Sequence, residues 1–209
     1  MNLDLLDIIG AIRPPEAVVI QSLAEGKACP DAIFVEVGVW KGHSASIIGE
    51  VVKRQGGSFC CVDHWRGSMG TGLVGEAEKH DIYSVFEHNM RELELWDCII
   101  PMRMDSETAS QSFADNSIDF FFLDADHRHK QFLDDLTNWT PKMKKGGIMC
   151  GHDCEGYYSQ MSPVEQEFIN KELDIDFNSY HSGVIKGLYD YFHDDYCIAD
   201  KTHIWFKEI

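Results

Sequence analysis

The chain has 209 residues, of which 44% are hydrophobic and 25% charged, values typical of a globular protein with one buried core. Its formal net charge of −17 argues against a basic face for nucleic acid or an anionic membrane, so we expect neither partner. No apolar run approaches the ~18 residues that span a bilayer, and the N-terminus lacks the basic residues of a secretory signal. The seven cysteines form no CxxC pair. We therefore expect reduced thiols and a cytoplasmic location.

Residues 1–30 contain two helical patterns. Apolar residues recur at helical spacing over 3–12 and stop at Pro14 and Pro15, and a second short helix is predicted over 16–24. We expect this segment to form a lid or brace on the domain that follows, and it carries no residue with an evident chemical role. The same helices could brace a homo-oligomer, a question that the sequence leaves open.

The chain is organised around residues 33–42. The β-branched and aromatic residues of 33–37 predict a strand that carries one carboxylate, Glu36, and ends at Gly38. Gly42 follows, just before an amphipathic helix predicted over 44–54. A strand, a tight turn and a helix N-terminus let the backbone approach a small ligand with unpaired N–H groups. The glycine spacing matches neither a dinucleotide fingerprint nor a P-loop, and many such turns hold no ligand.

Strands and helices alternate along the rest of the chain. Further strands are predicted at 58–62, 98–102, 118–123, 148–151, 196–199 and 203–207. Helices are predicted at 76–93, 128–139, 163–173 and 183–192, with a mobile glycine-rich loop at 66–75 and a glycine turn at 146–147. The pattern predicts an α/β fold with a doubly wound, mostly parallel seven-stranded sheet and an antiparallel C-terminal hairpin. The aromatic run 120–122 is expected in the core of its strand.

Acidic residues stand at or just beyond the ends of successive strands. Together with Glu36, they are Asp63, Asp105, Asp124 and Asp153, the last preceded by His152. Because the carboxyl ends of parallel strands meet at one edge of a sheet, we expect these groups around a single crevice. A carboxylate there can accept hydrogen bonds from a ribose diol, and Asp63 is the candidate for this contact. The alternative is that Asp63 only caps a helix or lies in a solvated loop.

Six segments carry a family resemblance. In chain order they are FVEVGVWKG, CCVDHWRG, MDS, FFFLDADH, KKGGIMCGHD and HSGVIKGLYDYF. In this order, over residues 33–207, the chain resembles the class I S-adenosylmethionine-dependent methyltransferases, and most of all the metal-associated small-molecule O-methyltransferases of the catechol and macrolide-sugar types. The resemblance implies a Rossmann-like methyltransferase fold, with residues 31–209 as the S-adenosylmethionine-binding methyltransferase domain.

The resemblance also implies a set of cofactor-binding residues. The loop under the methionine end matches residues near the first strand, the ribose and adenosine contacts match the end of the second, and the adenine contact follows the third. The implied residues are Glu36, Gly38, Lys41, Gly42, Ser44, Asp63, His64, Trp65, Asp105, Ser106 and Asp124. Asp124 ends the fourth strand, between the cofactor and the metal.

The resemblance implies a divalent metal of the Mg or Mn type at Asp124, His152 and Asp153. His127 matches a position that sugar-modifying relatives use as general base. His127 and Asp124 are therefore the candidate catalytic residues. The chain departs from the family at Cys154, where catechol-type enzymes have Asn, and at His152, where macrolide-type enzymes have an acid. Imidazole suits Mn²⁺, Fe²⁺ or Zn²⁺ better than Mg²⁺. His152 could equally support the fold alone, and His127 could be a polar residue in the first turn of a helix.

The leading hypothesis is therefore methyl transfer from S-adenosylmethionine to a hydroxyl of a small natural product or sugar-like acceptor, assisted by the metal. Two alternatives stay open: a metal-independent N- or O-methyltransferase, and a non-catalytic ligand-binding module on the same fold. The glycine-rich loop 66–75 has the composition of an active-site lid and favours an enzyme. The acceptor cannot be identified from these residues.

Overall fold

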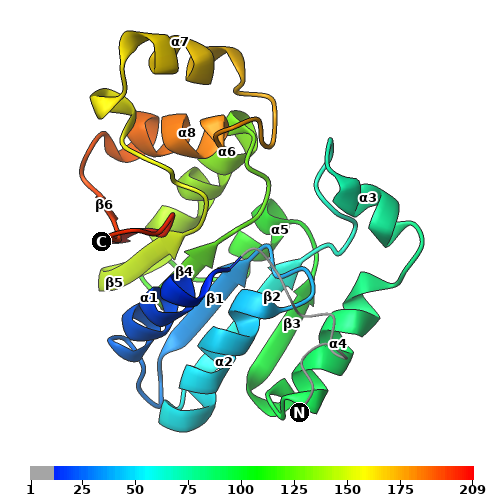
Figure 1. The fold of residues 1–209 in the computed structure, drawn as a ribbon. Helices are drawn as coiled ribbons and strands as arrows, with labels where there is room; N and C mark the ends of the chain where they lie inside the picture. The colour runs from blue at the N-terminus through cyan, green and yellow to red at the C-terminus, as the bar shows by residue number, and fades with distance from the viewer. Residues whose placement is uncertain (1–11) are drawn as a thin grey trace.

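The computed structural model describes residues 12–209, so the helical pattern predicted over 3–12 lies, apart from its last residue, outside the described residues. The chain forms one seven-stranded sheet with helices on both faces (Figure 1). The strands are β1 (Ile33–Val37), β2 (Ser58–Asp63), β3 (Ile99–Arg103), β4 (Ile118–Leu123), β5 (Met143–Gly151), β6 (Cys197–Ile198) and β7 (Trp205–Glu208). The α-helices are α1 (Pro14–Glu25), α2 (His43–Gln55), α3 (Gly72–Ala77), α4 (Ile82–Glu92), α5 (Ser106–Ser110), α6 (His129–Trp139), α7 (Pro163–Lys171) and α8 (Ser182–Phe192). Short 3₁₀ turns lie at Trp96–Cys98, Thr140–Lys142 and Tyr158–Gln160.

The strand order is β3-β2-β1-β4-β5-β7-β6. Strands β1 to β5 are mutually parallel, whereas β7 is antiparallel to both β5 and β6. This arrangement confirms the predicted fold class, including the antiparallel C-terminal hairpin. The order reverses between β1 and β4, and in doubly wound folds a ligand crevice opens at such a point.

Two apolar layers sandwich the sheet. One contains Phe34 and Phe120 and is covered by α1, α2 and α4; the other contains Val35 and Phe121 and is covered by α5, α6 and α8. Successive side chains of a strand alternate between faces, which explains why neighbours in the sequence enter different layers. The aromatic run 120–122 is fully buried, as predicted.

The predicted helix 76–93 is wrong as a single element. The structure has two helices instead, α3 and α4, separated by residues 78–81. Thr71 caps α3 by accepting a hydrogen bond from Leu73, so this helix begins inside the segment predicted as the loop 66–75. Asp81 is in an extended conformation before α4, and its carboxylate accepts a hydrogen bond from the Ser84 hydroxyl. Residues 78–81 are all polar and interrupt the apolar spacing, so the chain forms two shorter helices here.

The predicted turn at 146–147 is also wrong, because β5 continues through it. Gly146 has φ +79°, and the pairing of β4 with β5 shifts register between Ile118 and Phe120. A Cβ at Gly147 would lie 3.0 Å from the carbonyl oxygen of Ile118. The glycines thus permit an irregularity within the strand rather than its start.

Helix α1 packs against α2 and buries Ile20 and Ala24 in the core. It agrees with the helix predicted over 16–24, and the boundary proposed at residue 30 stays a prediction. No described helix is long and apolar enough to cross a membrane.

Candidate active site

A cavity of about 1070 Å³ opens at the carboxyl ends of β1, β2 and β4, where the strand order reverses. Most of the predicted site residues line it: Gly38, Lys41, Ser44, Asp63, His64, Asp105, Ser106, Asp124, His127 and Asp153. Four others do not: Glu36, Gly42, Trp65 and His152. Most of the predicted site residues therefore lie around one crevice, and the other four are not part of its lining.

The loop after β1 is shaped by Gly38, which has φ +90°. A Cβ at this position would lie 2.0 Å from the backbone oxygen of Asp124, so only glycine lets the ends of β1 and β4 come together. Glu36 is fully buried beneath this loop and accepts a 2.5 Å hydrogen bond from Ser44 Oγ. Burial raises the pKa of Glu36 well above its ordinary value. Glu36 thus supports Ser44 from below and does not reach the cavity surface.

Asp63 fixes the neighbouring loops. Its Oδ2 accepts a hydrogen bond from Trp40 N at 2.8 Å, and its Oδ1 accepts one from Trp65 N at 2.6 Å. The Trp65 ring is 3% exposed, packs against Phe86 and donates from Nε1 to the carbonyl of Trp40 at 2.7 Å. The prediction that Trp65 flanks the cofactor is not supported by this position, because its side chain packs in the core beneath the loop.

The adenine side of the predicted site contains a buried acid that sequence reasoning missed. Ser106 Oγ donates to Asp135 and accepts a 2.8 Å hydrogen bond from Trp139 Nε1. Asp105 is largely exposed and pairs with Arg66 at 3.1 Å. Burial raises the pKa of Asp135 to about 7, and the hydrogen bond from Ser106 only partly opposes this effect.

Replacing Asp135 by asparagine is expected to stabilise the protein at alkaline pH. Because the folded-state pKa lies above that of the unfolded chain, ionisation of Asp135 lowers the free energy of unfolding as pH rises from about 4 to about 7. The advantage of Asp135→Asn over the wild type should grow by about 2 kcal/mol between pH 5 and pH 8. Urea unfolding at the two pH values measures this change, and Asp134→Asn, an exposed neighbour on the same helix, is the matched control.

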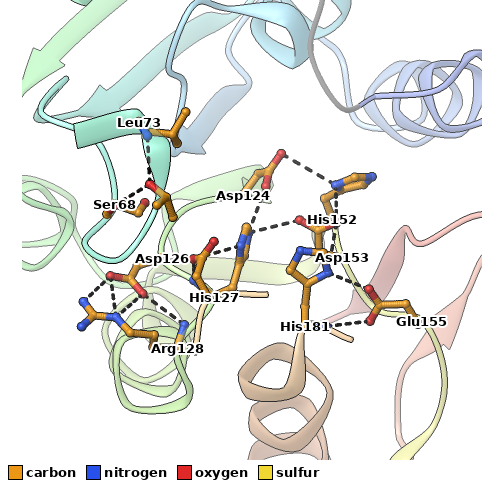
Figure 2. Close-up of polar contacts among 12 residues, drawn as sticks. Ser68, Leu73, Asp124, Asp126, His127, Arg128, His152, Asp153, Glu155 and His181 are labelled. Atoms are coloured by element: carbon orange, nitrogen blue, oxygen red, sulfur yellow. Dashed lines mark hydrogen bonds and ion pairs between the residues drawn. The ribbon is translucent and has the colours of Figure 1, made fainter. Parts of the chain in front are cut away.

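A group of acids and histidines closes the other side of the cavity, at the ends of β4 and β5 (Figure 2). His127 Nε2 lies 3.3 Å from Asp124 Oδ1 and 3.2 Å from Asp153 Oδ2. The Asp124 and His127 side chains meet because the two residues are three positions apart in the turn after β4. Asp153 has φ +64°, a left-handed conformation that Asp tolerates better than most residues, and it directs its carboxylate between the histidines.

His152 is 4% exposed and lies behind Asp124 and Asp153. Its Nδ1 is 3.0 Å from Asp153 Oδ1 and 4.0 Å from Asp124 Oδ2, while Nε2 is 3.3 Å from Glu16 Oε2. Neither ring nitrogen makes a hydrogen bond of good geometry. Both nitrogens therefore face carboxylates without a well-aligned hydrogen bond, which is uncommon for a buried imidazole.

A family model described as a methyltransferase domain matches residues 35–154. The chain belongs to this methyltransferase family. The matched residues run from β1 to just past Asp153, and they include the loop at Gly38, Asp63 and Asp124. The resemblance inferred from the sequence segments is therefore confirmed.

Solved structures of methyltransferases share the fold of this one. The O-methyltransferase TomG from Streptomyces achromogenes, in complex with SAM, is 12% identical with a TM-score of 0.60, covering 94% of this chain and 79% of its own. The O-methyltransferase from Bacillus cereus, in complex with SAH, is 13% identical with a TM-score of 0.59. The match covers 98% of this chain and 86% of the Bacillus cereus chain. The SAH-bound Podospora anserina methyltransferase PaMTH1 is 11% identical with a TM-score of 0.64. The match covers 96% of this chain and 79% of the PaMTH1 chain. At these identities the likeness concerns the fold.

This methyltransferase contains further cluster residues that sequence reasoning missed. His181, just before α8, places Nδ1 2.6 Å from Glu155 Oε1 and 3.5 Å from Asp153 Oδ1. Asp176 lies 3.3 Å from His127 Nδ1. His181 opens the segment HSGVIKGLYDYF that contributed to the resemblance, but nothing in the sequence indicated that it reaches Asp153. No comparable signal marked Glu155 or Asp176.

The cluster controls the protonation of its members. Burial favours the neutral form of Asp153, but the neighbouring His152, His127 and His181 outweigh it and hold the pKa of the carboxyl well below its ordinary value. Burial likewise opposes protonation of His152, but the adjacent carboxylates raise its pKa to about 9. The same balance, with Asp124 and Asp176 as the main partners, raises the pKa of His127 well above its ordinary value.

The donor set fits a divalent cation. Among the described residues, three groups bring their ligand atoms within 4.8 Å of one another: Asp124, His152 and Asp153; His127, Asp153 and His181; and Asp153, Glu155 and His203. Asp153 is common to all three. Mixed imidazole and carboxylate ligands suit Mn²⁺, Fe²⁺ or Zn²⁺. Nδ1 of His152, on the side of Asp124 and Asp153, would gain a partner in such an ion.

Proposed function

We propose that this methyltransferase transfers a methyl group from S-adenosylmethionine to a hydroxyl of a small-molecule acceptor, with assistance from a divalent metal. The observation that carries the proposal is that one cavity joins Gly38, Asp63 and Ser106, on the predicted cofactor side, to Asp124 and His127 in the acid and histidine cluster. At about 1070 Å³, the cavity is at the upper end of the size range for ligand sites and has room for two ligands.

Family membership and the cavity support S-adenosylmethionine as the donor. Methyltransferases of the same fold were solved with SAM or SAH, as in TomG and the Bacillus cereus enzyme. In this chain, the loop at Gly38 and Ser44 would hold the methionine end, and Asp63 the ribose. Asp63 already accepts two backbone hydrogen bonds, but its oxygens have further acceptor capacity for hydroxyl groups.

The cofactor supplies a methyl group activated on a sulfonium. Transfer breaks the carbon–sulfur bond and forms a carbon–oxygen bond, and the acceptor hydroxyl loses its proton. Because this displacement needs little covalent help, alignment of the acceptor is the main task of the protein. His127 lines the cavity beside Asp124, and it would take this proton in its neutral form, which a bound cation would favour by offsetting the neighbouring carboxylates.

Asp124, His152 and Asp153 would hold the divalent ion. Such an ion supplies positive charge that lowers the pKa of an acceptor hydroxyl and offsets the carboxylates around His127. Asp124 borders both the cofactor side and this cluster, so its carboxylate would orient the acceptor between them.

Calorimetry with S-adenosylmethionine tests the proposed donor. We expect binding by the wild type and an affinity at least about 10-fold lower in Asp63→Asn, because an amide replaces one acceptor oxygen with a donor. Trp65→Phe is the matched control, since it removes the hydrogen bond to Trp40 from the same loop but keeps the carboxylate. Equal loss in both variants would assign the effect to loop order instead of ribose recognition.

The same assays separate the alternatives. A protein that binds no S-adenosylmethionine at tens of micromolar would be a ligand-binding module of another kind. Methyl transfer that survives chelation would indicate a metal-independent enzyme, and a product methylated on nitrogen would identify an N-methyltransferase.

A further inference from the structure

Helix α1 contributes a buried acid to the cluster, although its sequence showed no chemical role. Glu16, in the first turn of α1, is 0% exposed. Its carboxylate accepts hydrogen bonds from the side chain of Arg13, from Arg13 N at 2.8 Å and from His203 N at 3.2 Å. Its Oε2 then lies 3.3 Å from Nε2 of His152, a residue of the predicted metal site.

Capping of α1 does not explain this burial. Helix α7 also has a proline at its first position and a glutamate, Glu165, whose carboxylate accepts a hydrogen bond from the backbone N–H of the N-cap residue, here Ser162. Glu165, however, makes this capping interaction at an exposed site. Because burying a carboxylate carries a cost in free energy, the position of Glu16 needs another reason, and His152 is the group that it reaches.

The contacts of His152 divide its two nitrogens. Nδ1 faces Asp153 and Asp124, whereas Nε2 faces Glu16. A histidine that binds a metal through one nitrogen usually directs the other N–H at a carboxylate or carbonyl, which fixes the tautomer and the ring orientation. Glu16 is the carboxylate in that place.

We propose that Glu16 is a positioning residue that holds the His152 ring with Nε2 toward α1 and Nδ1 toward a divalent cation bound by Asp124 and Asp153. The proposal rests on the metal in the proposed function. Arg13 pairs with Glu16 from the solvent side, so the charge of this second carboxylate is balanced. Helix α1 is therefore part of the metal centre as well as a brace.

The proposal makes metal selectivity depend on α1. A correctly oriented imidazole favours Mn²⁺, whereas Mg²⁺ prefers oxygen ligands. Loss of the orienting carboxylate should therefore weaken Mn²⁺ binding more than Mg²⁺ binding. A purely structural role for Glu16 would weaken both metals alike.

The test is titration of the apoprotein with Mn²⁺ alone and with Mg²⁺ alone, followed by calorimetry and, for Mn²⁺, by electron paramagnetic resonance. In Glu16→Gln, which is nearly isosteric, we expect Mn²⁺ affinity to fall by roughly 10- to 100-fold and the Mn²⁺/Mg²⁺ preference to shrink. Glu165→Gln, the same change in the other capping box, should leave both affinities unchanged. Thermal unfolding checks that each variant is folded.

Should Glu16→Gln fail to fold, Glu16→Asp gives the same test, because it keeps the charge but is one methylene short of His152. Wild-type Mn²⁺ affinity and selectivity in the folded variant would overturn the positioning role and leave the proposed function intact. Absence of Mn²⁺ binding by the wild type would overturn both this proposal and the metal in the proposed function, while S-adenosylmethionine binding would still be measured separately.

Discussion

Replacing Asp153 by asparagine is expected to lower methyl transfer by roughly 10²-fold or more and to remove specific Mn²⁺ binding. Asp153 belongs to all three candidate ligand groups, and its two oxygens face different histidines, Oδ1 toward His152 and Oδ2 toward His127. An amide has one oxygen and no charge, so it cannot serve both sides. The backbone conformation should be retained, since asparagine adopts the left-handed conformation of residue 153 at least as readily as aspartate.

The measurements are initial rates with and without chelator, and Mn²⁺ titration of each protein. Asp200→Asn, which removes the same charge from a side chain that is 89% exposed, should behave as the wild type. Unchanged activity in Asp153→Asn, together with insensitivity to chelation, would remove the metal from the mechanism.

Replacing Gly38 by alanine is expected to destabilise the fold by about 3 kcal/mol or more and to abolish S-adenosylmethionine binding. The added Cβ would lie 2.0 Å from the Asp124 backbone oxygen. Residue 38 also has φ +90°, a conformation that alanine rarely adopts. Because the collision is with backbone, no side-chain rotation can relieve it. The ends of β1 and β4 would have to separate, and the cavity lies between them.

Thermal unfolding and calorimetry with S-adenosylmethionine measure both effects, and a fall in melting temperature of roughly 6 °C or more is expected for a chain of this size. Gly75→Ala is the matched control. A Cβ at Gly75 meets no atom within 4 Å, and alanine is the better helix former within α3. A Gly38→Ala protein as stable as this control would show that the strand ends tolerate separation.

The sequence predicted the sheet well because buried strands have a strong local signature. The run 118–123 is apolar except for Asp119, and the structure has β4 over those same residues. Acids just past successive strands indicated one crevice, since parallel strands end at one edge. The pair Asp124 and His127 could also be predicted from the local sequence, because a spacing of three positions in a turn brings the two side chains together.

Other features were missed in the sequence or depend on tertiary contacts. Four polar residues, 78–81, separate α3 from α4 and interrupt the apolar spacing of the predicted helix 76–93. Trp65 follows the predicted ribose acid, but its side chain packs in the core against Phe86 and donates a hydrogen bond to the Trp40 carbonyl. The match of the segment CCVDHWRG therefore predicted the location of Trp65 beside Asp63, but not the direction of its side chain.

The α/β class, the strand-end acids and the methyltransferase family could be predicted from the sequence, because each of these depends on short-range periodicity or on residues next to a strand. Glu16, Asp176 and His181 could be assigned to the cluster at Asp153 only from the folded structure, since they come from α1 and from the segment before α8, far away in the chain. The physical reason is that packing of helices on the sheet, rather than spacing along the chain, brings these side chains to His127 and His152.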